Sequence, residues 1–359
     1  MAVYLGRGHL AAAYGSYVPW GLWVACYSWL VGLSFGAFFV AAAAHLAPVR
    51  WLAPLVRLAL VAALAAYLAG MLSIWLDLGR PERVWHLLAY TDFGSIMGIM
   101  AWSYTLYGCL LVAATVLSLA RGRVAGRALN VLLGTGLVLS VAAAGAAGAL
   151  FGAVGARPYW NEGILPLMFL FGAAVSGSAF VAAAAWLLRP DRPAPELESA
   201  VVGLGRAVLI ALPIYLLLEW AKYSIVWLAA VGTHVEALNL VLFGPYWWVF
   251  WVVHLGLGVA VPLAVLAIRG RSPAAVAAAC GLVAITFLAV RLNIVLPALA
   301  VEELRGLEQA FVHPRLSFAY TPTLIEWLVQ IWIIGIAGIV LLAARRWLKL
   351  FVGAEATHG

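Results

Sequence analysis

The feature that most constrains this chain is a series of long apolar runs separated by short polar connections. A helix that crosses a bilayer needs roughly 20 consecutive apolar residues. The sequence predicts about nine spanning helices by this criterion: Val18–Ala44, Leu52–Leu76, Ile96–Ala120, Gly126–Gly152, Ile164–Leu188, Val201–Val231, Asn239–Ile268, Pro273–Leu299 and Pro322–Leu348. No stretch between these runs is long enough to form a separate soluble domain.

The balance of residue types supports the same conclusion. Of the 359 residues, 66% are hydrophobic and only 10% are charged, whereas soluble domains carry about 25% charged residues. Such a chain cannot cover its own surface with polar groups, so we expect an all-α integral membrane protein with a single membrane domain. The formal net charge of +7 is better explained by membrane orientation than by binding to nucleic acid.

Arginines concentrate on alternate connections between the predicted helices. The basic set comprises Arg50, Arg57, Arg121, Arg123, Arg127, Arg189, Arg192, Arg269, Arg271 and the "RRWLK" tail. By the positive-inside rule this face is cytoplasmic. We expect a protein that crosses the inner membrane of a prokaryote several times. The N-terminus and the stretch "WLDLGRPERVWHLL" (Trp75–Leu88) then lie on the outer, periplasmic side.

The sequence also contains an internal similarity. The segment "LSFGAFFVAAAAHLAPVR" (Leu33–Arg50) resembles "VSGSAFVAAAAWLLRPDR" (Val175–Arg192) at one constant offset. Both segments run from outside to inside, which predicts two parallel-related bundles of four helices. The predicted divisions are residues 18–152 for the first bundle, 164–299 for the second, 300–321 for an outer loop and 322–348 for the last transmembrane helix.

Ionisable groups inside a bilayer are costly, so each is a candidate functional residue. Nearly all of them fall in the outer half of their helices, together with two neutral polar residues. The set is Tyr27, Asp77, Glu219, Lys222, His254, Arg291, Asn293 and Glu326. Glu219 and Lys222 are three residues apart, so they can pair on one helical face.

Each candidate also has a purely structural interpretation. The Glu219–Lys222 pair can be a structural ion pair, and His254 can bond a neighbouring helix. Arg291 can bond the carbonyl groups at a helix end, and Asp77 can be a helix-end residue beside Arg80. The shared depth of these groups is the stronger indication of a site, because a one-sided polar pocket suits a small amphipathic ligand.

We expect no haem and no metal in this chain. Cys26, Cys109 and Cys280 each lie inside an apolar run, and no CxxC motif or Cys/His pair appears. Haem b would need paired axial histidines at matched depth. Of the seven histidines only His254 is clearly central.

Three segments resemble the NrfD/PsrC family, the membrane subunits of polysulfide-reductase-like complexes. They are the first-helix stretch "VPWGLWVACYSWLVGLSFGAFFV", the corner "LDLGRPERVWHLL" and the C-terminal "VRLNIVLPALAVEELRGLEQAFVHPRLSFAYTPTLIEW". The last segment is most similar to the DsrP, HmcC and HybB subgroup. The resemblance spans nearly the whole chain.

This resemblance implies a haem-free membrane subunit that binds menaquinone or ubiquinone within a respiratory oxidoreductase of sulfur metabolism or anaerobic respiration. The outer corner would face a ferredoxin-like iron–sulfur subunit, and further catalytic or cytochrome subunits would complete the enzyme. The resemblance does not fix the direction of electron flow, the quinone type or the terminal substrate.

The candidate residues take two roles under this hypothesis. The predicted quinone pocket comprises Tyr27, Asp77, Arg80, His86, His254, Arg291 and Asn293. The predicted proton-delivery groups are Asp77, Glu219, Lys222 and Glu326. Two alternatives stay open at this point: a transporter-like subunit that moves ions or protons, and a purely structural membrane anchor.

Overall fold

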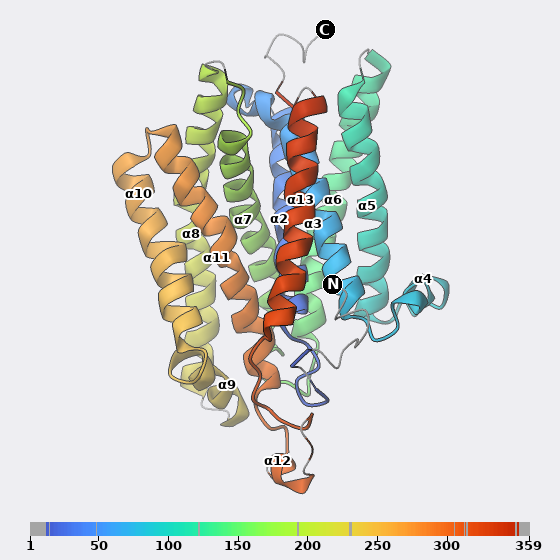
Figure 1. The fold of residues 1–359 in the computed structure, drawn as a ribbon, viewed down its shortest axis with the longest axis vertical. Helices are drawn as coiled ribbons and strands as arrows, with labels where there is room; N and C mark the ends of the chain where they lie inside the picture. Colours follow the sequence, from blue (N-terminus) through green and yellow to red (C-terminus); the bar gives the residue numbers. More distant parts are fainter. Residues whose placement is uncertain are drawn as a thin grey trace.

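The computed structural model describes residues 12–13, 15–47, 49–120, 123–191, 194–229, 232–304, 306–311, 313, 315–348 and 350–351. Helices dominate this part of the chain, and it contains no strand. Nine of its helices are long and apolar enough to cross a membrane, and they form one upright bundle (Figure 1). The predicted all-α membrane fold with about nine spanning helices is confirmed.

The long helices follow one another with short connections. Their bounds are α2 (Leu22–Leu46), α3 (Val56–Asp77), α5 (Ile96–Leu119), α6 (Arg123–Gly152), α7 (Leu165–Leu187), α8 (Pro195–Ala229), the π-helix η4 (Val249–Ala260) continued by α10 (Val261–Arg269), α11 (Pro273–Leu299) and α13 (Leu324–Trp347). Shorter helices lie between them: η2 (Arg50–Leu55), η3 (Pro81–Arg83), α4 (His86–Ala89), α9 (Gly232–Leu242) and α12 (Leu307–Ala310).

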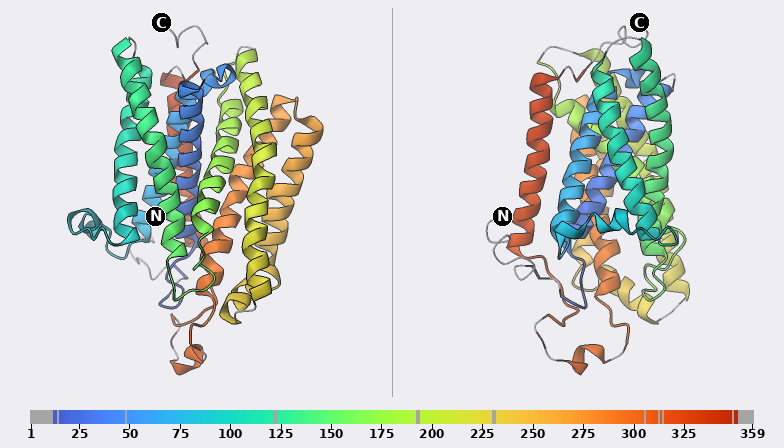
Figure 2. Two further views of the ribbon diagram at one scale, coloured as in Figure 1. Left: turned by 180° about the vertical axis from the view of Figure 1, so that it is seen from behind. Right: turned by 90° about the vertical axis from the view of Figure 1, so that its right-hand side faces the viewer.

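The two ends of the bundle differ in character. One end, the arginine-rich end, carries the short connections after α2, α5, α7 and α10 and the C-terminal end of α13. The other, the loop-rich end, carries α4, α9 and α12 with their long connections, as Figure 2 shows from two sides. Of the predicted basic set, Arg121, Arg192 and Lys349 lie outside the described residues, and the others lie at or near the arginine-rich end.

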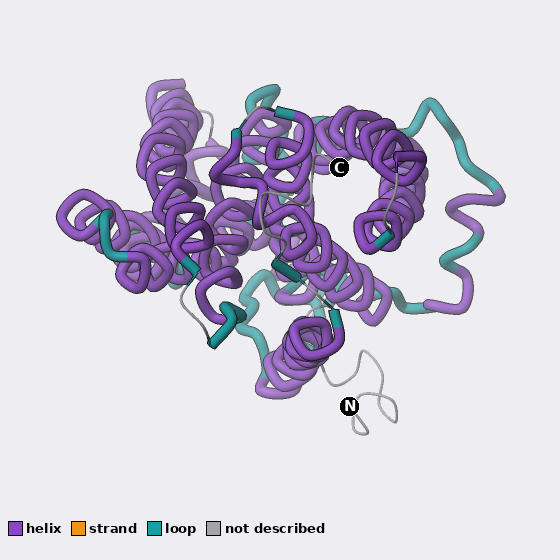
Figure 3. The backbone as a smooth tube through the Cα atoms, turned by 90° about the horizontal axis from the view of Figure 1, so that it is seen from above, coloured by secondary structure: helices purple, strands orange, loops and turns teal. Residues whose placement is uncertain are grey.

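Helices α2 and α7 cross at the centre of the bundle, where glycine allows their backbones to meet. A Cβ on Gly177 would lie 2.4 Å from the Cα of Gly36, and a Cβ on Gly36 would clash with the carbonyl of Ala173. Helix α2 packs mainly on α3 and α7, while α7 also packs on α6, α8 and α11. Figure 3 shows the helix bundle from above. The division into two related bundles of four helices stays a prediction.

The seventh predicted helix does not begin where the sequence suggested. The expected span Asn239–Ile268 is divided: α9 ends at Leu242, and the spanning helix begins only at Val249. Gly244 and Pro245 lie in the break, because proline lacks the backbone N–H that helix continuation needs. The later start places His254 near the loop-rich end of its helix rather than at its middle. The sixth helix begins at Pro195, earlier than the predicted Val201.

Candidate functional site

A buried guanidinium lies at the centre of the bundle. Arg291 of α11 is 2% exposed, and its Cζ lies 3.9 Å from the ring centroid of Phe169 on α7. Its Nη1 atom is buried and has no hydrogen-bond acceptor among the described residues. Because a buried polar group without a partner costs free energy, this nitrogen is a place where a ligand or water would be stabilised.

Arg291 lines a narrow cavity between α2, α5, α6, α7 and α11. The lining is Ser28, Val31, Gly32, Phe35, Tyr104, Ala144, Ala147, Phe169 and Arg291. On the α2 side Gly32 faces the guanidinium, since a Cβ built there would lie in ordinary contact, 3.5 Å from Arg291 Nη2. The cavity therefore combines aromatic walls with hydroxyl and guanidinium donors, and its volume of about 10 Å³ leaves room for about one water molecule.

The structure brings only part of the predicted pocket to this cavity. Tyr27 lies beside it, with its ring centroid 6.0 Å from that of Tyr104 and its hydroxyl 3.9 Å from Met100 Sδ. Asn293 is buried on α11, and its Nδ2 has no partner within the described part of the chain. Its backbone carbonyl accepts a hydrogen bond from the Tyr159 hydroxyl at 3.0 Å.

The described residues show no ion pair between Glu219 and Lys222, which sequence spacing had made possible. The carboxylate of Glu219 instead lies 2.7 Å from His254 Nε2, and both side chains are buried. This pairing joins α8 to the π-helix η4, in which His254 is the sixth residue. Twelve residues of π-helix are unusual, because π geometry appears mostly as single turns, frequently at functional sites.

Lys222 pairs with groups of the connection that precedes α7. Its Nζ lies 3.4 Å from Glu162 Oε2, donates to the Tyr159 carbonyl at 2.8 Å and sits 3.9 Å from the centroid of the Tyr159 ring. His234 of α9 approaches the other Glu162 oxygen at 2.9 Å. Burial raises the pKa of the Tyr159 phenol well above its ordinary value, so this tyrosine stays a neutral donor.

Glu326 occupies a helix cap. Its carboxylate accepts hydrogen bonds from the Tyr320 hydroxyl at 2.6 Å, the Thr323 N–H at 2.8 Å, the Thr323 hydroxyl at 3.0 Å and the Ala13 N–H at 3.2 Å. Together with the Thr323 hydroxyl that accepts from the Glu326 N–H, this is a complete capping box at the start of α13. The geometry favours a structural role for this residue, and its predicted proton delivery stays a prediction.

The stretch Trp75–Leu88, which we call the corner, projects from the loop-rich end together with the residues that follow it. Asp77 is the last residue of α3 and is partly buried, while Arg80 and His86 are exposed. The His86 ring lies edge-on to Trp85, with 4.1 Å between centroids, and Trp85, Tyr90 and Phe93 are all largely exposed. Arg80 and His86 therefore belong to a surface rather than to the central cavity.

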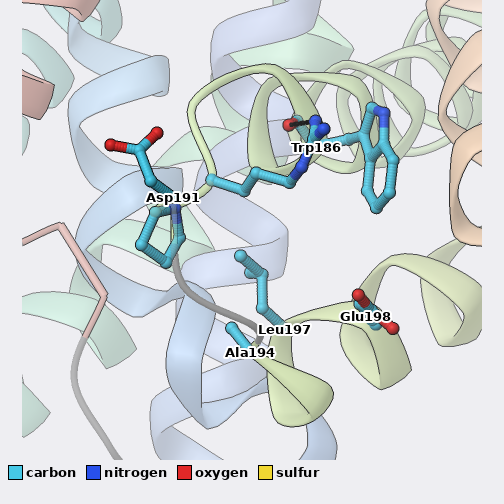
Figure 4. A pocket seen from close by; sticks show the side chains of 7 residues that line it. Trp186, Asp191, Ala194, Leu197 and Glu198 are labelled. Carbon is cyan, nitrogen blue, oxygen red and sulfur yellow. Dashed lines mark hydrogen bonds between the residues drawn. The ribbon is translucent and has the colours of Figure 1, made fainter.

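A separate hollow lies at the arginine-rich end, between the end of α7 and the start of α8 (Figure 4). Its lining is Trp186, Arg189, Pro190, Asp191, Ala194, Leu197 and Glu198. Arg189 stacks on Trp186 with 3.9 Å from Cζ to the ring centroid. This hollow is open to the surface and shares no lining residue with the central cavity, so it is no part of the same site.

Several residues of the cavity and its surroundings were not among the sequence candidates. Tyr104, Phe169 and Ser28 carry no charge and resemble any other residue of an apolar helix. Glu162 and His234 lie in connections, where charged residues are ordinary. One signal was present in "YLLLEWAKY": Tyr215, Glu219 and Lys222 are spaced at i, i+4 and i+7, which places them on one helical face.

The fold defines a multi-pass helical membrane protein with polar groups buried inside its bundle. The family model described as polysulphide reductase, NrfD, matches residues 12–302. The chain belongs to this family. Helix α13 lies beyond the matched region.

Comparison with known proteins agrees with this assignment. The chain is 28% identical to a selenate reductase subunit of Mesobacillus selenatarsenatis, over 99% of this chain and 91% of that protein. It is 24% identical to the Hdr-like menaquinol oxidoreductase integral membrane subunit of Archaeoglobus fulgidus, over 93% and 85%. It is also 24% identical to the menaquinone reductase integral membrane subunit of Nitratidesulfovibrio vulgaris, over 97% and 87%. The first of these alignments extends through α13.

Proposed function

We propose that this chain is the quinone-binding membrane subunit of a respiratory oxidoreductase complex. The names of two relatives, a menaquinol oxidoreductase subunit and a menaquinone reductase subunit, support this reaction class. The observation that carries the proposal is the buried, unpartnered Arg291 Nη1 in a cavity with aromatic walls. A bound quinone supplies two-electron, two-proton chemistry.

The chemistry of the lining residues suits such a ring, while the cavity volume of about 10 Å³ admits it only after side chains move. Arg291 and the hydroxyls of Ser28 and Tyr104 can donate hydrogen bonds to a carbonyl oxygen, and Phe169 and Phe35 can pack against the ring faces. The cavity is narrow, so we expect these aromatic side chains to rotate when a head group enters. Tyr27 would form the next layer behind Tyr104.

The partner that exchanges electrons would dock at the loop-rich end. We infer an iron–sulfur subunit there, because the exposed aromatic residues of the corner offer a surface of the kind that protein partners cover. Further catalytic or cytochrome subunits would complete the enzyme. Asp77, at the root of the corner, lies where a proton-delivery group could act.

The test measures binding of a soluble probe, 2,3-dimethyl-1,4-naphthoquinone, to the purified complex by calorimetry. Arg291→Gln should weaken binding at least about tenfold, because hydrogen bonds from charged groups contribute about 1.5–3 kcal/mol. Arg189→Gln is the matched control, since Arg189 also stacks on an aromatic ring but lies at the arginine-rich end. Equal affinity in both variants would remove Arg291 from the site. No binding to the unmodified complex would favour a structural anchor.

A further inference from the structure

One face of α8 carries three buried polar residues. Tyr215, Glu219 and Lys222 follow one another at i, i+4 and i+7, each about one helical turn, or about 5.4 Å, from the next. None is more than 4% exposed. Burying a polar group within a membrane-spanning helix costs free energy. Three buried polar residues on a single helical face therefore indicate a continuous polar path.

The path begins at the loop-rich end, close to water. Lys222 contacts Glu162, and Glu162 contacts His234. The side chains of Glu162 and His234 are 14% and 13% exposed, in contrast to the completely buried side chain of Lys222. A surface hollow at this end is lined by Tyr159 and by Thr233, the residue before His234. Protons can therefore be exchanged with solvent at this pair.

The path ends near Arg291, which lines the central cavity. One turn deeper than Lys222, Glu219 holds His254 at 2.7 Å. One further turn deeper, the Tyr215 hydroxyl is buried without a partner among the described residues. A Cβ built on Gly172 would lie 3.3 Å from Tyr215 Cε2 and 3.4 Å from Arg291 Nη2, so the phenol ring and the guanidinium meet over this glycine.

We propose that these residues, His234, Glu162, Lys222, Glu219, His254 and Tyr215, form a proton route between the loop-rich face and the quinone cavity. We name them the α8 polar row. The proposal rests on the proposed function: forming a quinol takes up two protons with two electrons, and oxidising it releases both. Electrons pass through the partner subunit, and the protons move along the α8 polar row.

The chemistry of each member suits this role. The carboxylates of Glu162 and Glu219 each face an imidazole nitrogen, so a proton can pass between oxygen and nitrogen at both pairs. Lys222 is a positioning residue that fixes Glu162 beside α8. The unpartnered Tyr215 hydroxyl and Arg291 Nη1 are the polar groups that an ordered water would bridge, because buried waters bind otherwise unsatisfied polar groups.

The experiment uses the intact complex and two readouts. The first is the affinity for 2,3-dimethyl-1,4-naphthoquinone; the second is the rate at which its quinol reduces the redox groups of the complex, followed by absorbance. Glu162→Gln and Glu219→Gln should keep the affinity within about twofold but slow the rate about 10²-fold, as for loss of an acid–base group. Formate or imidazole should restore much of the rate in Glu162→Gln, which is near the surface, but not in Glu219→Gln.

Glu236→Gln is the matched control, because Glu236 is an exposed carboxylate on α9, two residues from His234. Its rate should be unchanged. A normal rate in both Glu162→Gln and Glu219→Gln, with quinone still bound, would overturn the route while leaving the proposed function intact. If Glu219→Gln fails to assemble, the test rests on His234→Gln and Glu162→Gln. A slowed rate in these two variants that added weak acids or bases do not restore would also overturn the proton route.

Discussion

At the scale of single residues, buried polar groups divide into those whose bonds are complete and those with bonding capacity left over. Glu326 accepts four hydrogen bonds around the start of α13. Arg291 and Tyr215 each keep a buried polar atom without a partner in the described chain. This difference, and not charge or depth alone, separates a structural group from a candidate for binding.

Replacing Glu326 should therefore affect stability and not catalysis. Glu326→Ala removes the cap and leaves buried donors unsatisfied, and either effect costs on the order of 1–3 kcal/mol. We expect a lower Tm of the purified protein and an unchanged rate of quinol oxidation. Glu308→Ala, at an exposed position of α12, should change neither. Unchanged Tm together with slower oxidation would instead support the proton-delivery role.

At the scale of secondary-structure elements, the central crossing of α2 and α7 fixes how the other helices are placed. Gly36 and Gly177 let the two backbones meet without side chains between them, as small residues do at helix contacts in membranes. The crossing positions α7, which carries Phe169, against α11, which carries Arg291. The cavity therefore depends on this contact.

A methyl group at the crossing should destabilise the bundle. Gly177→Ala places a Cβ 2.4 Å from Gly36, so the helices must separate, and overpacking of this kind costs about 1–3 kcal/mol. Gly134→Ala, where no atom lies within 4 Å of the new Cβ, should be neutral or slightly stabilising, because alanine favours helix. Thermal unfolding of both variants tests this, and equal Tm values would contradict the tight crossing.

At the scale of the whole molecule, the two ends of the helix bundle differ in their residues and in the functions we expect of them. The arginine-rich end has short connections and basic residues, as a cytoplasmic face does. The loop-rich end carries the exposed aromatic corner, the entrance of the α8 polar row and the long connection between α11 and α13. Partner docking and proton exchange are therefore expected on one side of the membrane.

Removing the corner aromatics should weaken assembly without unfolding the chain. Trp85 and Phe93 are 54% and 66% exposed, so the double variant Trp85→Ala, Phe93→Ala loses little internal packing. We expect less of the partner to copurify with it. The control is Trp347→Ala, which is 77% exposed at the arginine-rich end and should leave copurification unchanged. Full recovery of the partner with the double variant would place the docking surface elsewhere.

The orientation of the bundle is tested with reporters. Alkaline phosphatase inserted into the 300–321 connection should be active, because this enzyme needs the periplasm to form its disulfides. The same reporter fused after α13 should be inactive. The reverse pattern would invert the topology and place the corner, the polar row and the proposed docking surface on the cytoplasmic side.

The sequence by itself determined the number and approximate extent of the membrane helices and the alternation of the basic connections. These properties depend on local composition and on bilayer thickness. The corner motif also identified the family, which the family model confirms. None of this required knowledge of which helices touch.

Only the tertiary structure decided which polar groups meet. Glu219 and Lys222 lie near each other along α8, yet each bonds a residue from another part of the chain, because the rotation and depth of neighbouring helices choose the partner. Glu162 and His234 lie far apart in the sequence and meet only after α9 folds against the connection before α7. Arg291 was a visible candidate, but its cavity exists only because α2, α5, α6 and α7 converge on it. The pairing of polar side chains across helices depends on how the helices pack, and a local sequence pattern does not predict that packing.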